Sequence, residues 1–219
     1  MTRRTNARIA GLTFLIYIAS GITATVLASR ATAGAEGTAA RLAAIAQHTT
    51  DVRMAFALNL LTCFAALVLA VTLYAITREQ DRDLALLAFA CRVAEGVLGG
   101  IFISGALGRL WLATSTGASA PDTTTVNALG SLFSNAGAWN TGATFFAVGS
   151  ALFSWLLLRG RTIPVPLAYL GIVASVLLMV GLPLQLTGIL TGSMTQLMWI
   201  PMLAFEVPVG FWLLIKKIP

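Results

Sequence analysis

Charged residues are scarce in this chain, where Asp, Glu, Lys and Arg make up 10% of the 219 residues and hydrophobic residues make up 58%. In a soluble domain about a quarter of the residues are charged, so a water-soluble fold is not expected. The apolar residues gather in six runs of roughly 20 residues, the length at which an α-helix crosses a bilayer. Such unbroken runs do not match the short alternating strands of a transmembrane barrel. The sequence therefore predicts an all-α polytopic transmembrane helical bundle.

Residue types that hold cofactors and metals are also rare. The single histidine, His48, falls in a predicted connection, which excludes two-histidine haem ligation within one chain and an H-E-x-x-H zinc site. The two cysteines, Cys63 and Cys91, lie inside apolar runs and provide no disulfide framework. No cofactor and no metal site are predicted.

Familiar catalytic motifs are missing from the chain as well. It contains no G-x-S-x-G nucleophile elbow and no P-loop. An aspartate-dyad intramembrane protease is not expected, because every aspartate lies outside the apolar runs. These aspartates are Asp51, Asp81, Asp83 and Asp122.

Six spanning helices are predicted, and together they form a single transmembrane domain over residues 1–219. Their approximate ranges are 9–29, 52–77, 84–113, 136–158, 165–190 and 196–215. Residues 38–47 and 123–134 are predicted to form short extra helices in the connections, the first of them at the membrane interface. Pro183 predicts a kink in the fifth span.

Positively charged residues are distributed unevenly over the two sides of the predicted bundle. Six spans place both termini on one side, together with nine basic residues: Arg3, Arg4, Arg8, Arg78, Arg82, Arg159, Arg161, Lys216 and Lys217. The opposite side carries three, which are Arg30, Arg41 and Arg53. The positive-inside rule then predicts that both termini lie in the cytoplasm. We expect a multi-pass protein of the plasma membrane. The same rule explains the net charge of +6 better than nucleic-acid binding does.

Three charged residues lie deep inside predicted spans. At about 1.5 Å per residue, Arg92 and Glu95 lie about 14 and 18 Å from the cytoplasmic end of the third span, and Glu206 lies about 15 Å from the end of the sixth. An unpaired charge at that depth costs at least about 2.5–3.5 kcal/mol. We therefore expect a buried polar cluster of these residues between the third and sixth spans. Because two carboxylates share one arginine, one of them is expected to hold a proton.

The expected cluster has more than one interpretation. It either holds the helices together without a substrate, in a non-enzymatic bundle, or forms a site for an ion, a proton or a small solute. The second interpretation makes the protein a small transporter or proton-coupled carrier that uses Glu95 or Glu206. An intramembrane lipid-modifying enzyme with a glutamate as acid or base ranks last, because no nucleophile–base pair is visible. Further polar candidates inside the spans are Asn59, Asn140 and Gln185.

A row of small residues continues from Arg92 along the third span. At a spacing of four, it comprises Gly96, Gly100, Ser104 and Gly108. Such rows let two helices approach closely, either within one chain or between two copies. Because Arg92 occupies the preceding position, the row is expected to face inward. Membrane lipids are the expected partners, a homo-oligomer through this row is the alternative, and no nucleic acid is expected.

Four short segments carry a resemblance to a known family. They are residues 8–12 (RIAGL), 91–95 (CRVAE), 161–164 (RTIP), and Glu206 followed by 210–216 (GFWLLIK). Through these segments the chain resembles the bacterial family called domain of unknown function 4386 (DUF4386). The segments are spread along the sequence, so the resemblance covers nearly the whole length of the chain. The resemblance implies a six-helix integral membrane protein and singles out Arg92, Glu95 and Glu206. It implies no activity, because the family is uncharacterised.

The first span is also compatible with a cleaved signal peptide, because residues 31–33 (ATA) resemble a small-residue cleavage site. Its apolar core of about 19 residues is longer than the roughly 7–15 residues of a secretory signal, so we expect a retained helix. N-terminal sequencing of the mature protein tests this prediction. A mature chain that starts at Gly34 would contradict it.

Overall fold

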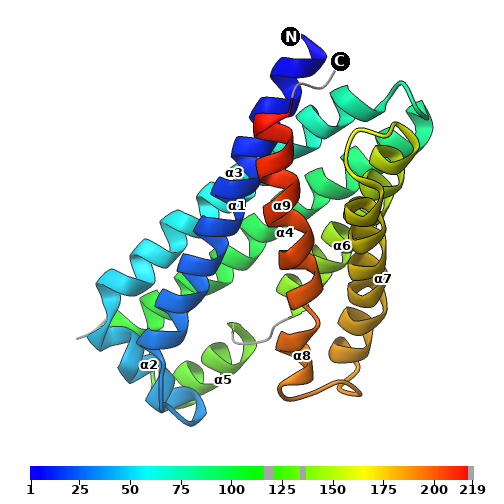
Figure 1. The fold of residues 1–219 in the computed structure, drawn as a ribbon. Helices are drawn as coiled ribbons and strands as arrows, with labels where there is room; N and C mark the ends of the chain where they lie inside the picture. The colour runs from blue at the N-terminus through cyan, green and yellow to red at the C-terminus, as the bar shows by residue number, and fades with distance from the viewer. Residues whose placement is uncertain (116–120, 134–136, 217–219) are drawn as a thin grey trace.

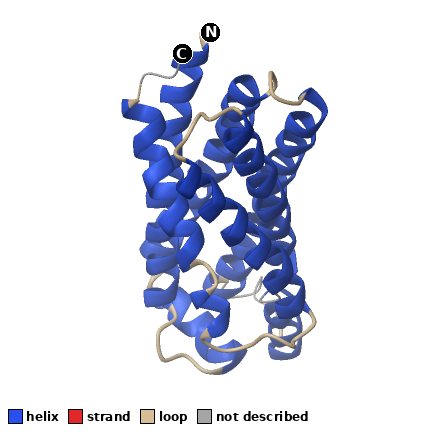
Figure 2. Cartoon of the chain, turned by 45° about the vertical axis from the view of Figure 1, so that its right-hand side comes forward, coloured by secondary structure: helices blue, strands red, loops and turns tan. Residues whose placement is uncertain are grey.

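A computed structural model of the chain describes residues 1–115, 121–133 and 137–216, and helices are the only regular elements in this part (Figures 1 and 2). In chain order they are α1 (Arg3–Ala31), α2 (Gly37–Gln47), α3 (Thr49–Thr77), α4 (Arg82–Thr114), α5 (Thr123–Phe133), α6 (Gly137–Arg159), α7 (Val165–Leu186), α8 (Met194–Leu197) and α9 (Ile200–Ile215). The prediction of an all-α fold is confirmed. Residue 136, where the fourth span was expected to begin, and Lys217 lie outside the described residues.

The described residues contain six segments long and apolar enough to cross a membrane, as the sequence predicts. They are α1, α3, α4, most of α6, α7, and the stretch Met194–Ile215 that combines α8 and α9. The start of α4 is set by Asp81, whose Oδ1 accepts a hydrogen bond from the backbone N–H of Leu84 at 3.1 Å. The short helices expected at 38–47 and 123–134 correspond to α2 and α5.

The last two spans end or break at other residues than expected. Helix α7 ends at Leu186 rather than at residue 190, because Gly188 adopts a left-handed φ of 75° just after the helix and so stops it. The predicted span 196–215 is divided between α8 and α9. Pro201, at the second position of α9, has no N–H to bond to the preceding turn and therefore favours a new helix start.

The six spans form a ring in chain order. Helix α1 packs against α3, α3 against α4, α4 against α6, α6 against α7, and α7 against α9, which returns to pack against α1. The two termini therefore lie close together at one end, whereas α2 and α5 pack on α4 at the other end (Figure 1). In this order α4 and α9 occupy opposite positions, so their side chains approach each other through the interior of the ring.

The interior and the outer surface of the ring are both mostly apolar. Core side chains such as Leu73, Phe146 and Val209 are 2% exposed or less. On the outside, large apolar side chains such as Phe64 and Val173 remain 58% and 63% exposed. Exposed apolar surface on this scale is expected of a protein surrounded by lipid rather than by water.

The ring closes where α1 meets α9, and two glycines allow this contact. A Cβ atom on Gly11 would lie 2.5 Å from the backbone N of Leu214 and 2.6 Å from the backbone O of Gly210. A Cβ atom on Gly210 would lie 3.3 Å from the backbone O of Gly11. Helix backbones approach this closely only where small residues face each other, so closure of the ring depends on both glycines.

Replacement of Gly11 by alanine should force α1 away from α9 and destabilise the bundle, because the added methyl group has no room beside two backbone atoms. Overpacked sites of this kind cost about 1–3 kcal/mol. The measurement is the Tm of the purified protein in one detergent or nanodisc. Gly100→Ala is the matched control, because a Cβ at Gly100 meets no atom within 4 Å. Equal Tm values for the two variants would contradict the proposed closing contact.

Candidate functional site

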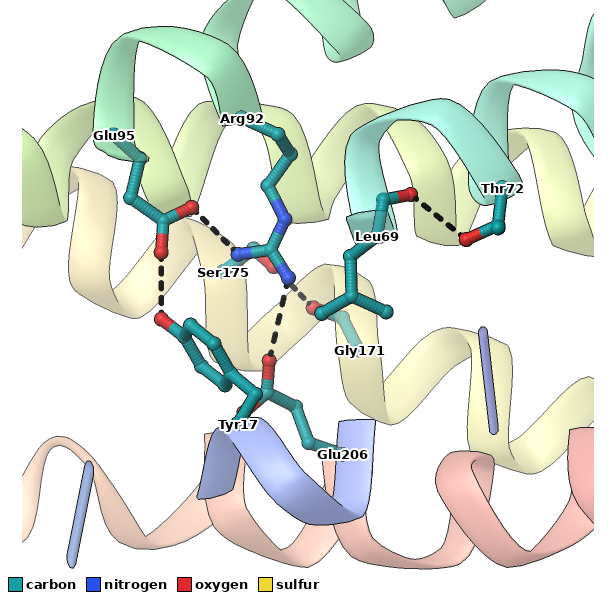
Figure 3. Close-up of polar contacts among 8 residues, drawn as sticks. All are labelled: Tyr17, Leu69, Thr72, Arg92, Glu95, Gly171, Ser175 and Glu206. Atoms are coloured by element: carbon teal, nitrogen blue, oxygen red, sulfur yellow. Dashed lines mark hydrogen bonds and ion pairs between the residues drawn. The ribbon is translucent and has the colours of Figure 1, made fainter. Parts of the chain in front are cut away.

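Arg92 is the centre of a buried polar cluster in the middle of the ring (Figure 3). Its side chain is 1% exposed although it is long and charged. The Nη1 group donates a hydrogen bond to Oε2 of Glu95 at 2.7 Å. The two residues are three positions apart on α4, so the expected i, i+3 contact is present.

Tyr17 joins the cluster from α1. Its hydroxyl group donates a hydrogen bond to Oε1 of Glu95 at 2.6 Å (Figure 3). The Glu95 carboxylate therefore accepts one hydrogen bond on each oxygen, from Arg92 and from Tyr17. Charge-assisted bonds of this length are among the stronger ones in proteins. Glu95 is therefore held firmly by Arg92 of its own helix and by Tyr17 of α1.

Glu206 approaches the same guanidinium group from α9, on the opposite side of the ring. Its Oε1 lies 4.0 Å from Nη2 of Arg92, which is an ion pair without a hydrogen bond. The residue is 5% exposed. The sequence-predicted residues Arg92, Glu95 and Glu206 are thus brought together, but the two carboxylates differ, because Glu95 is firmly bonded and Glu206 is paired by charge alone.

Two aromatic rings surround the guanidinium group and replace part of its lost hydration. The Cζ atom of Arg92 lies 4.8 Å from the ring centroid of Phe146 on α6 and 5.4 Å from that of Tyr17. The two rings stack on each other at 6.3 Å with an interplanar angle of 10°. Contacts of this kind are worth about 2 kcal/mol or more when they are desolvated. Four spanning helices, α1, α4, α6 and α9, therefore contribute to the cluster.

The row of small residues on α4 does not face one way. Gly96 lies against α3, where its Cβ would be 3.2 Å from the backbone O of Cys63, and Gly108 lies against Phe133 of α5. A Cβ at Gly100 would meet no described atom within 4 Å, and Ser104 is exposed. A spacing of four residues turns the row by about 40° at each step, because an α-helix has 3.6 residues per turn. The inward direction of Arg92 is therefore lost along the row.

The other polar residues predicted inside the spans take no part in the hydrogen bonds among the cluster residues. Asn140 is 3% exposed, and its Oδ1 has no hydrogen-bond partner in the part of the chain that the structure describes. Asn59 and Gln185 are partly exposed. Cys63 and Cys91 are free thiols. Within residues 1–115, 121–133 and 137–216, no three His, Cys, Asp or Glu side chains are grouped so that they could hold a metal ion.

Tyr17 and Phe146 are the cluster residues that the sequence does not identify. One signal for Tyr17 was available: it lies near the middle of the first span, whereas a membrane tyrosine is usually found near an interface. Phe146 carries no such signal, because phenylalanine is common throughout apolar helices. Its role depends on which face of α6 turns toward α4.

These features define a class, namely an integral membrane protein with six spans in a ring around a buried arginine-centred cluster. The chain belongs to the family described as a domain of unknown function (DUF4386), whose family model matches residues 9–216. The matched range contains the whole cluster, and the resemblance seen in the sequence is confirmed. No curated protein and no solved structure matches the chain.

Replacement of Arg92 by alanine should strongly destabilise the protein, because it leaves the buried Glu206 and the partly buried Glu95 without their cation. Removal of one partner from a buried ion pair costs about 3–5 kcal/mol. The measurement is the Tm in detergent or nanodiscs together with the yield of folded protein. Arg109→Ala is the control, because Arg109 also lies in α4 but is partly exposed. A Tm unchanged by Arg92→Ala would exclude a stabilising role for the cluster.

Proposed function

We propose that the protein is a non-enzymatic integral protein of the plasma membrane whose buried Arg–Glu cluster ties its helices together. The observation that carries this proposal is the burial of Arg92, which is 1% exposed and contacts side chains from α1, α6 and α9. A carrier needs a route by which its solute reaches the site from water. A lipid-modifying enzyme needs an opening from the site toward the bilayer. The burial of the guanidinium group at the centre of the ring instead favours a structural tie.

The proposed orientation places both termini in the cytoplasm. At the end of the ring where the termini lie, the described basic residues are Arg3, Arg4, Arg8, Arg78, Arg82, Arg159, Arg161 and Lys216. At the other end they are Arg30, Arg41, Arg53 and Arg109. Positive charge in excess at one end supports a cytoplasmic position for that end.

A proton-coupled carrier is the second candidate, and Glu206 is the observation that favours it. Its Oε1 is buried and accepts no hydrogen bond from the described residues, and its ion pair with Arg92 is 4.0 Å long. A loosely held carboxylate deep in a membrane span is the kind of group that exchanges a proton or a cation in transporters. Glu95, with both oxygens bonded, is the less suitable of the two for such exchange.

Lipid acyl chains are the partners proposed for the outer surface of the ring. Gly100 and Ser104 form the more open part of the small-residue row among the described residues, because a Cβ at Gly100 would meet nothing within 4 Å and Ser104 is exposed. This part is where a second copy would pack if the protein forms a homo-oligomer. Nothing in the proposal requires a nucleic acid, a cofactor or a metal.

Cysteine accessibility separates the two candidate functions. In a background without Cys63 and Cys91, single substitutions Ser150→Cys and Ser154→Cys place a thiol beside Arg92, because both serines line a small cavity with it. Intact cells and inverted vesicles are treated with a membrane-impermeant thiol reagent. The structural proposal predicts that neither thiol is labelled from either side in protein with a wild-type Tm. Labelling of either thiol from one side would show a water route and favour the carrier.

Two exposed positions act as labelling controls and also test the orientation. Glu79 lies in the turn between α3 and α4, at the end where the termini lie, and Ser193 lies just before α8 at the opposite end. We expect Ser193→Cys to react in intact cells and Glu79→Cys to react only in inverted vesicles. The reverse pattern would place the termini outside the cell.

A further inference from the structure

A small cavity lies beside Arg92, on the side of the cluster nearer the termini. Its volume is about 10 Å³, and its lining includes Arg92, Ser150, Ser154, Phe153 and Phe205. In α6, Ser154 lies one turn beyond Ser150 toward Arg159, the end of the helix nearer the termini. A volume of this size holds about one water molecule. Glu95 and Glu206 are not among the residues that line the cavity.

Two of the residues that line this cavity each carry a buried polar atom that has no hydrogen-bond partner among the described residues. These atoms are Nε of Arg92 and Oγ of Ser154. Both residues are 1% exposed, so bulk water does not reach either group. A buried donor or acceptor left unsatisfied costs about 1–3 kcal/mol, and more when it is charged. The cavity therefore brings together two groups that both need a small polar partner.

The charges around the cavity select the kind of partner. A cation is disfavoured by the adjacent guanidinium group, and an anion is disfavoured because Glu95 and Glu206 already share the single positive charge of Arg92. An apolar occupant would leave Nε and Oγ unsatisfied. Water is neutral and can accept a bond from Nε–H while it donates to or accepts from a hydroxyl group. Buried waters in proteins typically satisfy polar groups in this way.

We propose that this cavity is a binding site for one water molecule that links Nε of Arg92 to Oγ of Ser154. The water completes the hydrogen bonding of the guanidinium group, whose Nη1 is bonded to Glu95 and whose Nη2 faces Glu206. It joins α6 to α4 by a polar contact in addition to the contact of Phe146. A structural water bound beside the buried guanidinium group is compatible with the structural role proposed for the cluster.

Solid-state NMR tests the water site in the intact protein. The protein is labelled with ¹⁵N-arginine and placed in deuterated lipid bilayers in ordinary water. The Arg92 Nε–H signal is identified by its loss in Arg92→Lys. We expect magnetisation to pass from water protons to this Nε–H, although the residue is buried. A visible Arg92 Nε–H signal without this transfer, under conditions that give it for the exposed Arg53, would overturn the proposal.

Ser154→Val is the diagnostic variant, because its larger apolar side chain fills the cavity and removes the hydroxyl group. We expect the water transfer to Arg92 Nε–H to be lost. Ser175→Ala is the matched control, because the hydroxyl group of Ser175 is also buried but bonds to the backbone O of Gly171 at 2.7 Å in its own helix. The control should keep the transfer. Transfer that persists in folded Ser154→Val would show that the water lies elsewhere.

A crystal structure provides a second readout that needs no substitution. We expect density for one water at hydrogen-bond distance, about 2.7–3.2 Å, from Nε of Arg92 and from Oγ of Ser154. A cavity that is well resolved and lacks this density would also overturn the proposal. This readout applies even if Ser154→Val fails to fold.

Discussion

A guanidinium group in the middle of a membrane span must find its countercharge and its hydrogen bonds inside the protein. Arg92 finds countercharge in Glu95 of α4 and Glu206 of α9, and a hydrogen bond to Glu95. The aromatic rings of Tyr17 on α1 and Phe146 on α6 lie against the guanidinium group. A charge left unpaired at this depth is costly, so these helices must be in place together before the side chain is stable. The requirement of one residue thus couples four of the six spans.

The ring order of the helices makes this coupling possible. Because consecutive spans are neighbours, α4 and α9 lie opposite each other, and only long side chains extending into the interior bring them together. Gly11 and Gly210 allow α1 and α9 to pack closely. Helix α1 carries Tyr17, and α9 carries Glu206. Close backbone packing and the polar cluster therefore support each other: the first narrows the ring, and the second holds its interior together.

The carboxylates of Glu95 and Glu206 are the same chemical group, but their surroundings bind them differently. Glu95 is in the same helix as Arg92 and is fixed by two hydrogen bonds, whereas Glu206 comes from the far side and is 4.0 Å away. Depth along the helix predicted that both lie near Arg92, since depth follows from counting residues. The difference between them depends on distances of about 1 Å across the ring, which residue counting does not resolve.

Length and composition alone determined the membrane class, the number of spans and the depth of Arg92, Glu95 and Glu206, because these properties follow from apolar run length and helix rise. Rotation of each helix about its own axis was decided only by tertiary packing. That rotation brought Tyr17 and Phe146 to the guanidinium group, turned Ser104 away from the interior and left a water-sized cavity beside Ser154. In a span that is apolar on every side, hydrophobic periodicity carries little information on which face turns inward, so only the packed ring could specify it.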